Sequence, residues 1–140
     1  MDKTNPPETH GVFKPVGHTV MAFRSDADLQ GAANALRGLG FSNADLVCYT
    51  PQEMVNQASS ERKRAGALAA FGYELDLVNI DLALAQSGCS FLVVYAPEPD
   101  QAERAAQVAR ALHAVSAQHY GTFMIEDVVT PTVPDTPVRA

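Results

Sequence analysis

Hydrophobic and polar residues follow one another along this chain in a way that predicts two similar units, each made of a strand, a helix and a second strand. The first unit starts at Gly17 and the second at Gly88. Runs rich in Val, Phe, Tyr and Ile are typical of strands, because branched and aromatic side chains suit a pleated surface. On this basis the predicted strands span 18–23, 44–50, 90–96 and 122–127.

Each unit also contains an alanine-rich helix, which is predicted from apolar residues that recur every three to four positions on one helical face. Ser25 is the predicted N-cap of the first helix, and Asp100, with Glu103 three residues later, is that of the second. The apolar stripe of the first helix is Leu29, Ala32, Ala33, Leu36 and Leu39. That of the second is Ala105, Val108, Ala109, Leu112 and Val115.

This order of elements predicts an α+β fold, a ferredoxin-like βαββαβ sandwich. We expect its first and third strands to be central and parallel, with the second and fourth strands at the edges. A helical insertion over about residues 51–87 separates the second strand from the third. Thr50, Pro51 and Glu53 form a good start for its first helix, and 73–86 is predicted to be its last.

The folded region predicted from this pattern is one domain over residues 16–128. On either side of it, residues 1–15 and 129–140 contain several prolines and few apolar residues. Such segments bury too little apolar surface to offset the entropy of ordering them. We therefore expect mobile tails at both ends.

Both faces of the predicted central strands are apolar, which sets a requirement for the rest of the fold. Successive residues of the run FLVVY, at 91–95, point to opposite faces, and all of them are apolar. A sheet with two apolar faces needs cover on both, and the helices of the two units cover one. The second face is covered either by the inserted helices or by another subunit. We favour a homodimer in which the insertion takes part.

Composition and charge narrow the class of protein. The 140 residues are 46% hydrophobic and 19% charged, which is ordinary for a globular domain. No apolar run approaches the roughly 20 residues of a membrane span, and the first residues lack the apolar core of a secretion signal. We therefore expect a cytoplasmic protein with reduced thiols. A net charge of −6 argues against nucleic acid and anionic membranes as partners.

Cys89 is the first candidate for chemistry, because it stands between Gly88 and Ser90 at the start of a strand. A cysteine in a nucleophile elbow follows a strand, whereas Cys89 precedes one. It would also lie near the C-terminal end of the inserted helix, where the partial negative charge raises the pKa of a thiol. In the repeat register, however, His18 matches Cys89, and Cys48 could come near. A Cys–His pair can generate a thiolate. A structural thiol is the favoured interpretation, with a thiol enzyme that uses Cys89 and His18 as an alternative.

No metal site or cofactor is predicted. The four histidines show none of the spacings of zinc sites, and no glycine-rich phosphate loop is present. Glu74, Asp76 and Asp81 in the insertion are interpreted as a polar helix margin rather than as acid–base residues. Residues 87–94 match an RNA-binding signature in part, but they lack its basic residue and two of its aromatic residues. RNA binding is therefore not expected.

Residues 20–50, VMAFRSDADLQGAANALRGLGFSNADLVCYT, resemble the N-terminal repeat of the general stress protein 17M type. The shared features are a strand, an acidic cap, an alanine-rich helix, the motif L..LGF and a second short strand. The glycine-rich middle segment usual in that family is represented only by AGALAAFG. The resemblance implies a small bacterial, stress-associated accessory protein without known catalytic residues.

These observations together favour a non-enzymatic regulatory or stress-associated interaction domain. One alternative is a small-molecule sensor, as in ACT-like domains with the same strand–helix order, where ligands sit between subunits. Polar residues at strand ends, His18, Arg24 and Tyr49, are then the ligand-binding candidates, together with Cys89. The expected partners are a second copy of the chain, another protein or a small ligand.

Overall fold

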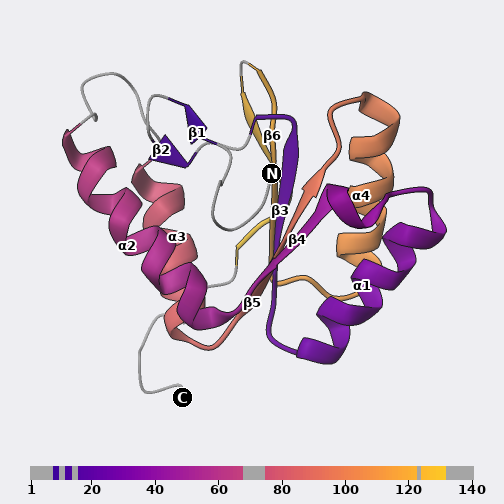
Figure 1. The fold of residues 1–140 in the computed structure, drawn as a ribbon, viewed down its shortest axis with the longest axis horizontal. Coiled ribbons are helices and arrows are strands. Elements are labelled where there is room, and N and C mark those ends of the chain that lie inside the picture. The colour runs from indigo at the N-terminus through magenta and orange to yellow at the C-terminus, as the bar shows by residue number, and fades with distance from the viewer. Residues whose placement is uncertain (1–7, 10–11, 14–15, 68–74, 123, 132–140) are drawn as a thin grey trace.

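A five-stranded antiparallel sheet forms the centre of the computed structural model, which describes residues 8–9, 12–13, 16–67, 75–122 and 124–131 (Figure 1). Across the sheet the strands are ordered β4 (Leu46–Tyr49), β5 (Ser90–Tyr95), β3 (His18–Phe23), β6 (Ser116–Tyr120) and β7 (Ile125–Val129). The helices are α1 (Asp26–Gly38), α2 (Pro51–Ala67), α3 (Leu75–Gln86) and α4 (Pro99–Ala111). The short elements are β1 (Glu8–Thr9), β2 (Val12–Phe13) and the 3₁₀ turn η1 (Asn43–Asp45).

The α+β fold class is confirmed, and so are three of the four predicted strands. β3 has the predicted bounds, and β4 and β5 lie within the predicted segments 44–50 and 90–96. α1 and α4 follow β3 and β5, as the apolar stripes predicted. The inserted helices α2 and α3 fall between β4 and β5.

The predicted parallel pairing of the two central strands is wrong. β3 and β5 are neighbours at the centre but run antiparallel, with His18 opposite Tyr95 and Phe23 opposite Ser90. Because β4 is antiparallel to β5, and β6 to β3, the two strands of each unit run in the same direction. One strand of the other unit fills the gap between them. The two units are therefore interleaved, an arrangement that hydrophobic periodicity does not encode.

The predicted strand over 122–127 is confirmed only in part, because β7 begins at Ile125 and extends to Val129. Val115, predicted on the apolar stripe of the second helix, lies outside that helix. α4 ends at Ala111, so Val115 lies beyond it and packs on the other face of the sheet. The next strand, β6, has the sequence SAQHY, which lacks the run of branched residues that marked the other strands. A turn then leads into β7, closed by the N–H of Gly121, which donates to the carbonyl of Met124 at 2.9 Å.

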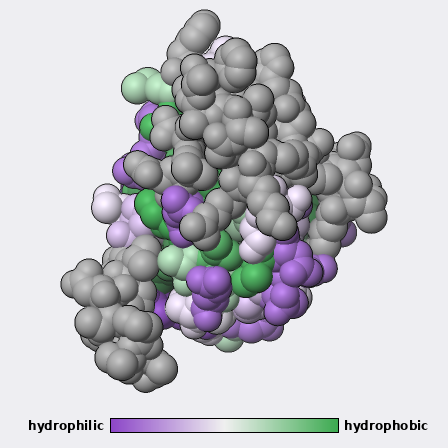
Figure 2. All heavy atoms as spheres, turned by 90° about the vertical axis from the view of Figure 1, so that its left-hand side faces the viewer, coloured by the Kyte–Doolittle hydropathy of each residue, from purple (hydrophilic) through white to green (hydrophobic). Residues whose placement is uncertain are grey.

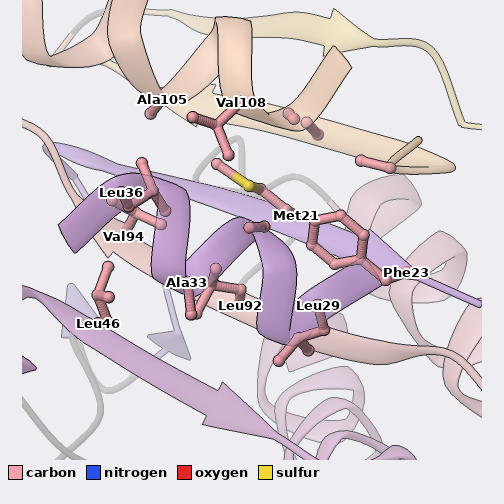
Figure 3. Packing of buried hydrophobic residues seen from close by; sticks show 14 of the residues in the cluster. Met21, Phe23, Leu29, Ala33, Leu36, Leu46, Leu92, Val94, Ala105 and Val108 are labelled. Carbon is pink, nitrogen blue, oxygen red and sulfur yellow. The ribbon is translucent and has the colours of Figure 1, made fainter. Parts of the chain in front are cut away.

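One face of the sheet packs against α1 and α4, as Figures 1 and 3 show. From the central strands this face receives Met21, Phe23, Leu92 and Val94. The predicted stripes cover them: Leu29, Ala32, Ala33 and Leu36 of α1 and Ala105, Val108 and Ala109 of α4. The small alanines let both helices approach the sheet closely. Each large side chain that is fully buried here contributes about 1.5–3 kcal/mol.

The other face packs against the inserted helices α2 and α3, on the opposite side of the sheet (Figure 1). A second buried cluster joins these helices to the strands: Met54, Leu84, Ala85, Val20, Ala22, Phe91 and Val93. Helices of the same chain therefore cover the second apolar face, which decides the alternative that the sequence left open. Figure 2 views this side, where hydrophobic residues lie among hydrophilic ones on the described part of the surface.

The N-caps of α1 and α2 are those predicted. The Oγ of Ser25 accepts a hydrogen bond from the N–H of Asp28 at 3.2 Å. At the start of α2, the N–H of Thr50 donates to the carboxylate of Glu53 at 2.9 Å, and the N–H of Glu53 donates back to the Thr50 hydroxyl at 3.1 Å. Local sequence chemistry therefore fixes where both helices begin.

The predicted N-cap of α4 is wrong. Glu98 is the cap, Pro99 occupies the first turn, and the N–H of Glu98 donates to the side chain of Gln101 at 3.0 Å. Asp100 lies inside the first turn and forms an ion pair with Arg104, one turn later. Proline favours the first helical position because its missing N–H would have no partner there, so the helix starts earlier than Asp100 implied.

Three helices end at a residue with positive φ: Gly40 after α1 (+100°), Gly88 after α3 (+101°) and His113 after α4 (+63°). After each, an N–H reaches back to the last helical turn, from Phe41 to Leu36, from Cys89 to Leu84 and from Ala114 to Ala109. This is the Schellman arrangement, which usually takes glycine. His113 has a Cβ, so its left-handed backbone costs about 1 kcal/mol.

The predicted tails lie largely outside the described residues. Within the N-terminal segment, β1 and β2 pair as a short antiparallel ribbon, and β2 lies beside α2. β7 extends to Val129, the first residue of the predicted C-terminal tail. None of the helices in the described part of the chain has the length and apolar character that crossing a membrane requires.

We predict that His113→Gly raises the free energy of unfolding by up to about 1 kcal/mol, because glycine relieves the left-handed strain. Part of this gain is offset because glycine also increases the conformational entropy of the unfolded chain. Gly40→Ala is the matched control, and we expect it to lower the free energy of unfolding by about 1 kcal/mol. Urea unfolding of both variants measures these changes. A His113→Gly variant less stable than the native chain would contradict strain at this position.

Candidate functional site

The four candidate residues from the sequence lie at two opposite ends of the sheet. His18 begins β3, whereas Arg24 follows the last residue of that strand. Tyr49 ends β4 and Cys89 precedes β5, and both belong to the buried cluster under α2 and α3. Because β5 is antiparallel to both β3 and β4, Cys89 lies at the same end as Arg24 and Tyr49. His18 is at the other end.

The Cys89–His18 pair considered from the sequence is wrong. In the observed register His18 faces Tyr95, at the far end of β5 from Cys89. At about 3.3 Å per residue, the length of this strand puts roughly 20 Å between them. Cys48 faces Leu92 and packs toward α1 and α4, so it does not come near Cys89 either. The expected pair depended on parallel central strands, and the strands are antiparallel.

Cys89 is a buried thiol with a packing role. Its exposed fraction is 0%, and burial raises the pKa of the thiol, although a hydrogen bond with Ser87 and the charge of Arg24 oppose this rise. The Oγ of Ser87 lies 3.9 Å from the Cys89 sulfur. A protonated thiol without access to solvent is a poor nucleophile, so the structural interpretation of Cys89 is the better supported one.

His18 belongs to an aromatic group at the opposite end of the sheet. Its ring centroid lies 4.8 Å from that of Tyr95, and Tyr120 is opposite it on β6. The Nδ1 of His18 lies 3.1 Å from the carbonyl oxygen of Val16, to which it can donate. The side chain is buried, and these contacts make it part of the packing between β3, β5 and β6.

Sequence reasoning missed a cleft of about 380 Å³ between α4 and the β6–β7 hairpin. One wall consists of residues at and before the start of α4 and along one of its faces: Pro97, Glu98, Pro99, Ala102, Glu103, Ala106 and Arg110. The other wall comes from the hairpin: His119, Gly121, Glu126, Asp127 and Val128. The helical wall could be recognised from its spacing, but the facing wall depends on β6, which was not predicted as a strand, and on β7, which was predicted only in part. We refer to this feature as the α4–hairpin cleft.

His119 lines the α4–hairpin cleft from β6. Its Nδ1 lies 2.8 Å from the Oγ1 of Thr19, which is fully buried on β3. Burial lowers the pKa of His119, and the charge of Glu126 on β7 partly opposes this effect. The ring is therefore neutral at pH 7.

The charge of the α4–hairpin cleft is mainly negative. Among its lining residues, the guanidinium of Arg110 is opposed by three glutamates, Glu98, Glu103 and Glu126. Asp127 also borders the cleft, but its carboxylate accepts a hydrogen bond from the amide of Gln118 at 3.2 Å. A molecule bound here meets carboxylates together with the apolar surface of the prolines and alanines.

Asp81 on α3 is buried, which corrects its interpretation as part of a polar helix margin. Its exposed fraction is 6%. It lies four residues after Leu77 and three before Leu84, on the helix face that packs toward the sheet. Burial raises the pKa of its carboxyl to about 7. The side chains of Glu74 and Asp76, grouped with it from the sequence, lie outside the described residues.

Metal-binding clusters and similar proteins are two further sources of evidence about the function of the cleft and of the buried residues. Within the part of the chain that the structure describes, no group of three or more His, Cys, Asp or Glu side chains is placed to hold a metal ion. No protein-family model, curated protein or solved structure matches this chain.

We predict that Asp81 makes stability depend on pH. From about pH 4 to pH 7 the folded chain holds a proton on this carboxyl that the unfolded chain releases, so the free energy of unfolding falls as pH rises. Asp81→Asn removes this slope and raises the free energy of unfolding above pH 7 by roughly 1–4 kcal/mol. The exposed Asp26→Asn is the control. Urea unfolding across this pH range with an unchanged slope for Asp81→Asn would contradict the assignment.

Proposed function

We propose that this chain is a non-enzymatic domain that binds a small ligand in the α4–hairpin cleft. The observation that carries the proposal is the cleft itself, which brings charged, polar and apolar side chains from two separate walls together. Its volume of about 380 Å³ is within the range of small-molecule sites. The wide separation of Cys89 from His18 supports a binding role over thiol catalysis.

We further propose that the domain is ferredoxin-like, with α2 and α3 as an insertion and β7 as an added edge strand. The order β4-β5-β3-β6 supports this, because the two βαβ units interleave with antiparallel neighbours. The ligand position differs from the one expected from ACT-like domains. The cleft uses α4 and the hairpin rather than His18, Arg24 and Tyr49. The stress-associated role, bacterial origin and cytoplasmic location stay predictions.

We expect a ligand of the cleft to raise the melting temperature of the native chain, because it binds only the folded state. At a ligand concentration of about 100 times Kd the stabilisation is about 2.7 kcal/mol. A thermal-shift screen of amines, amino acids, carboxylates and nucleotides searches for such a ligand. Ala102→Leu narrows the cleft and should abolish the shift, whereas Ala111→Leu, on the exposed end of α4 outside the cleft, should retain it.

Two outcomes of this screen would contradict the proposed function. In the first, no compound stabilises the native chain. In the second, a compound stabilises the Ala102→Leu variant as strongly as the native chain, which would place its site elsewhere.

As a second function, we propose homodimer formation through exposed apolar side chains at the His18 end of the sheet. Val16, Tyr95 and Met124 are 40%, 44% and 65% exposed. Hydrogen bonds from Gly17 to Tyr120 and from Ala96 to Gly17 hold the adjoining strand ends together. The dimer expected from the sequence relied on an uncovered sheet face, which α2 and α3 cover. This surface is therefore the better supported interface.

We expect Met124→Glu to shift the chain from dimer to monomer, because a charge would be buried at the interface. Gln107→Glu adds the same charge on the exposed side of α4 and should leave the dimer intact. Sedimentation velocity over a range of protein concentrations measures both. A native chain that stays monomeric at every concentration, or a Met124→Glu variant that dimerises normally, would rule out this interface.

A further inference from the structure

We propose that the ligand of the α4–hairpin cleft is an alkyl polyamine, a small organic cation in which methylene segments alternate with ammonium groups. This inference rests on the proposed ligand-binding function and adds the chemical class of the ligand. Three features of the cleft carry it: the placement of its carboxylates, the apolar surface between them, and the neutral state of His119.

The carboxylates approach the cleft from different elements. Glu103 lies on α4 and Glu126 on β7, so they belong to opposite walls. Glu98 is the N-cap of α4. A cation between the two walls is attracted by both. All three carboxylates are exposed to solvent, so water and salt weaken this attraction, and the cleft contributes by placing the charges on both sides of one cation. The same arrangement repels carboxylates, phosphates and nucleotides.

Apolar side chains occupy the space between these charges. Ala102 and Ala106 line the cleft from α4, Val128 lines it from β7, and Pro97 and Pro99 border it near Glu98. Methylene segments of a polyamine can pack on this surface while its ammonium groups meet the carboxylates. A metal ion has no apolar part, and the described residues do not provide a cluster that could coordinate one.

The two basic residues of the cleft restrict where the cation lies. Arg110 follows Glu103 by two helical turns, about 10 Å along α4, so its charge is at the other end of the helical wall. His119 adds no positive charge at pH 7, because burial keeps its pKa low. When its Nδ1 donates to Thr19, its Nε2 is an acceptor that suits an ammonium N–H. We therefore place the polyamine between Glu98, Glu103 and Glu126.

Calorimetric titration of the whole chain with spermidine, near neutral pH and at low salt, tests this inference. We expect saturable binding that weakens as salt is added. Glu103→Gln and Glu126→Gln, from opposite walls, should each raise Kd by about 3- to 10-fold. Arg110→Gln removes a repulsive charge and should lower Kd by about twofold or more.

Asp26→Asn is the matched control, because it removes one negative charge from an exposed position in the first turn of α1, away from the cleft. We expect its Kd for spermidine to stay within about twofold of the native value. If it weakens binding as much as Glu103→Gln does, spermidine responds to the overall charge of the chain, and the inference is overturned. A lysine-rich peptide that competes with spermidine and binds more tightly would also overturn it, by identifying a basic protein segment as the occupant.

The thermal-shift screen separates failure of this inference from failure of the proposed function. If spermidine does not bind, but another compound stabilises the native chain and not Ala102→Leu, the ligand class is wrong and the cleft is still the site. If no compound does so, the binding function fails together with the ligand class.

Discussion

The two apolar faces of the central strands are the constraint on which the rest of this structure depends. β3 and β5 are buried on both sides, so neither face of the sheet can be left to solvent. α1 and α4 cover one face with alanine-rich stripes, and the inserted α2 and α3 cover the other. The insertion is therefore a necessary layer of the fold and not an appendage to it.

The interleaved strand order determines which side chains come together. Because β6 pairs with β3, His119 lies beside Thr19, although they are far apart in the sequence. The β6–β7 turn brings Glu126 opposite His119. α4 packs over β3, β6 and β7, and the cleft lies where its exposed face meets the hairpin. The same order separates Cys89 from His18, which removes the catalytic pair that a parallel arrangement would have created.

Burial changes the proton affinity of Cys89, Asp81 and His119 in different ways. It raises the pKa of Cys89 and of Asp81, because the negative form of each loses water. It lowers the pKa of His119, because the positive form loses water. The result is a protonated thiol, a carboxyl that titrates near neutrality and an uncharged imidazole. This combination is poorly suited to nucleophilic catalysis, whereas a neutral imidazole in an acidic cleft is compatible with binding a cation.

The sequence by itself determined the features that depend on neighbouring residues. Ser25 and Thr50 fix the starts of their helices through hydrogen bonds to residues three positions later. The run at 91–95 is apolar on both faces of the strand, so this strand must lie between two packed layers. Tertiary structure alone decided the direction of the central strands, because periodicity along a strand is the same for parallel and antiparallel neighbours. It also decided the α4–hairpin cleft, since β6 lacks a strand-like pattern and becomes a strand by pairing with β3 and β7. Burial of Asp81 likewise depends on which helix face meets the sheet, and that is a property of the packed layers.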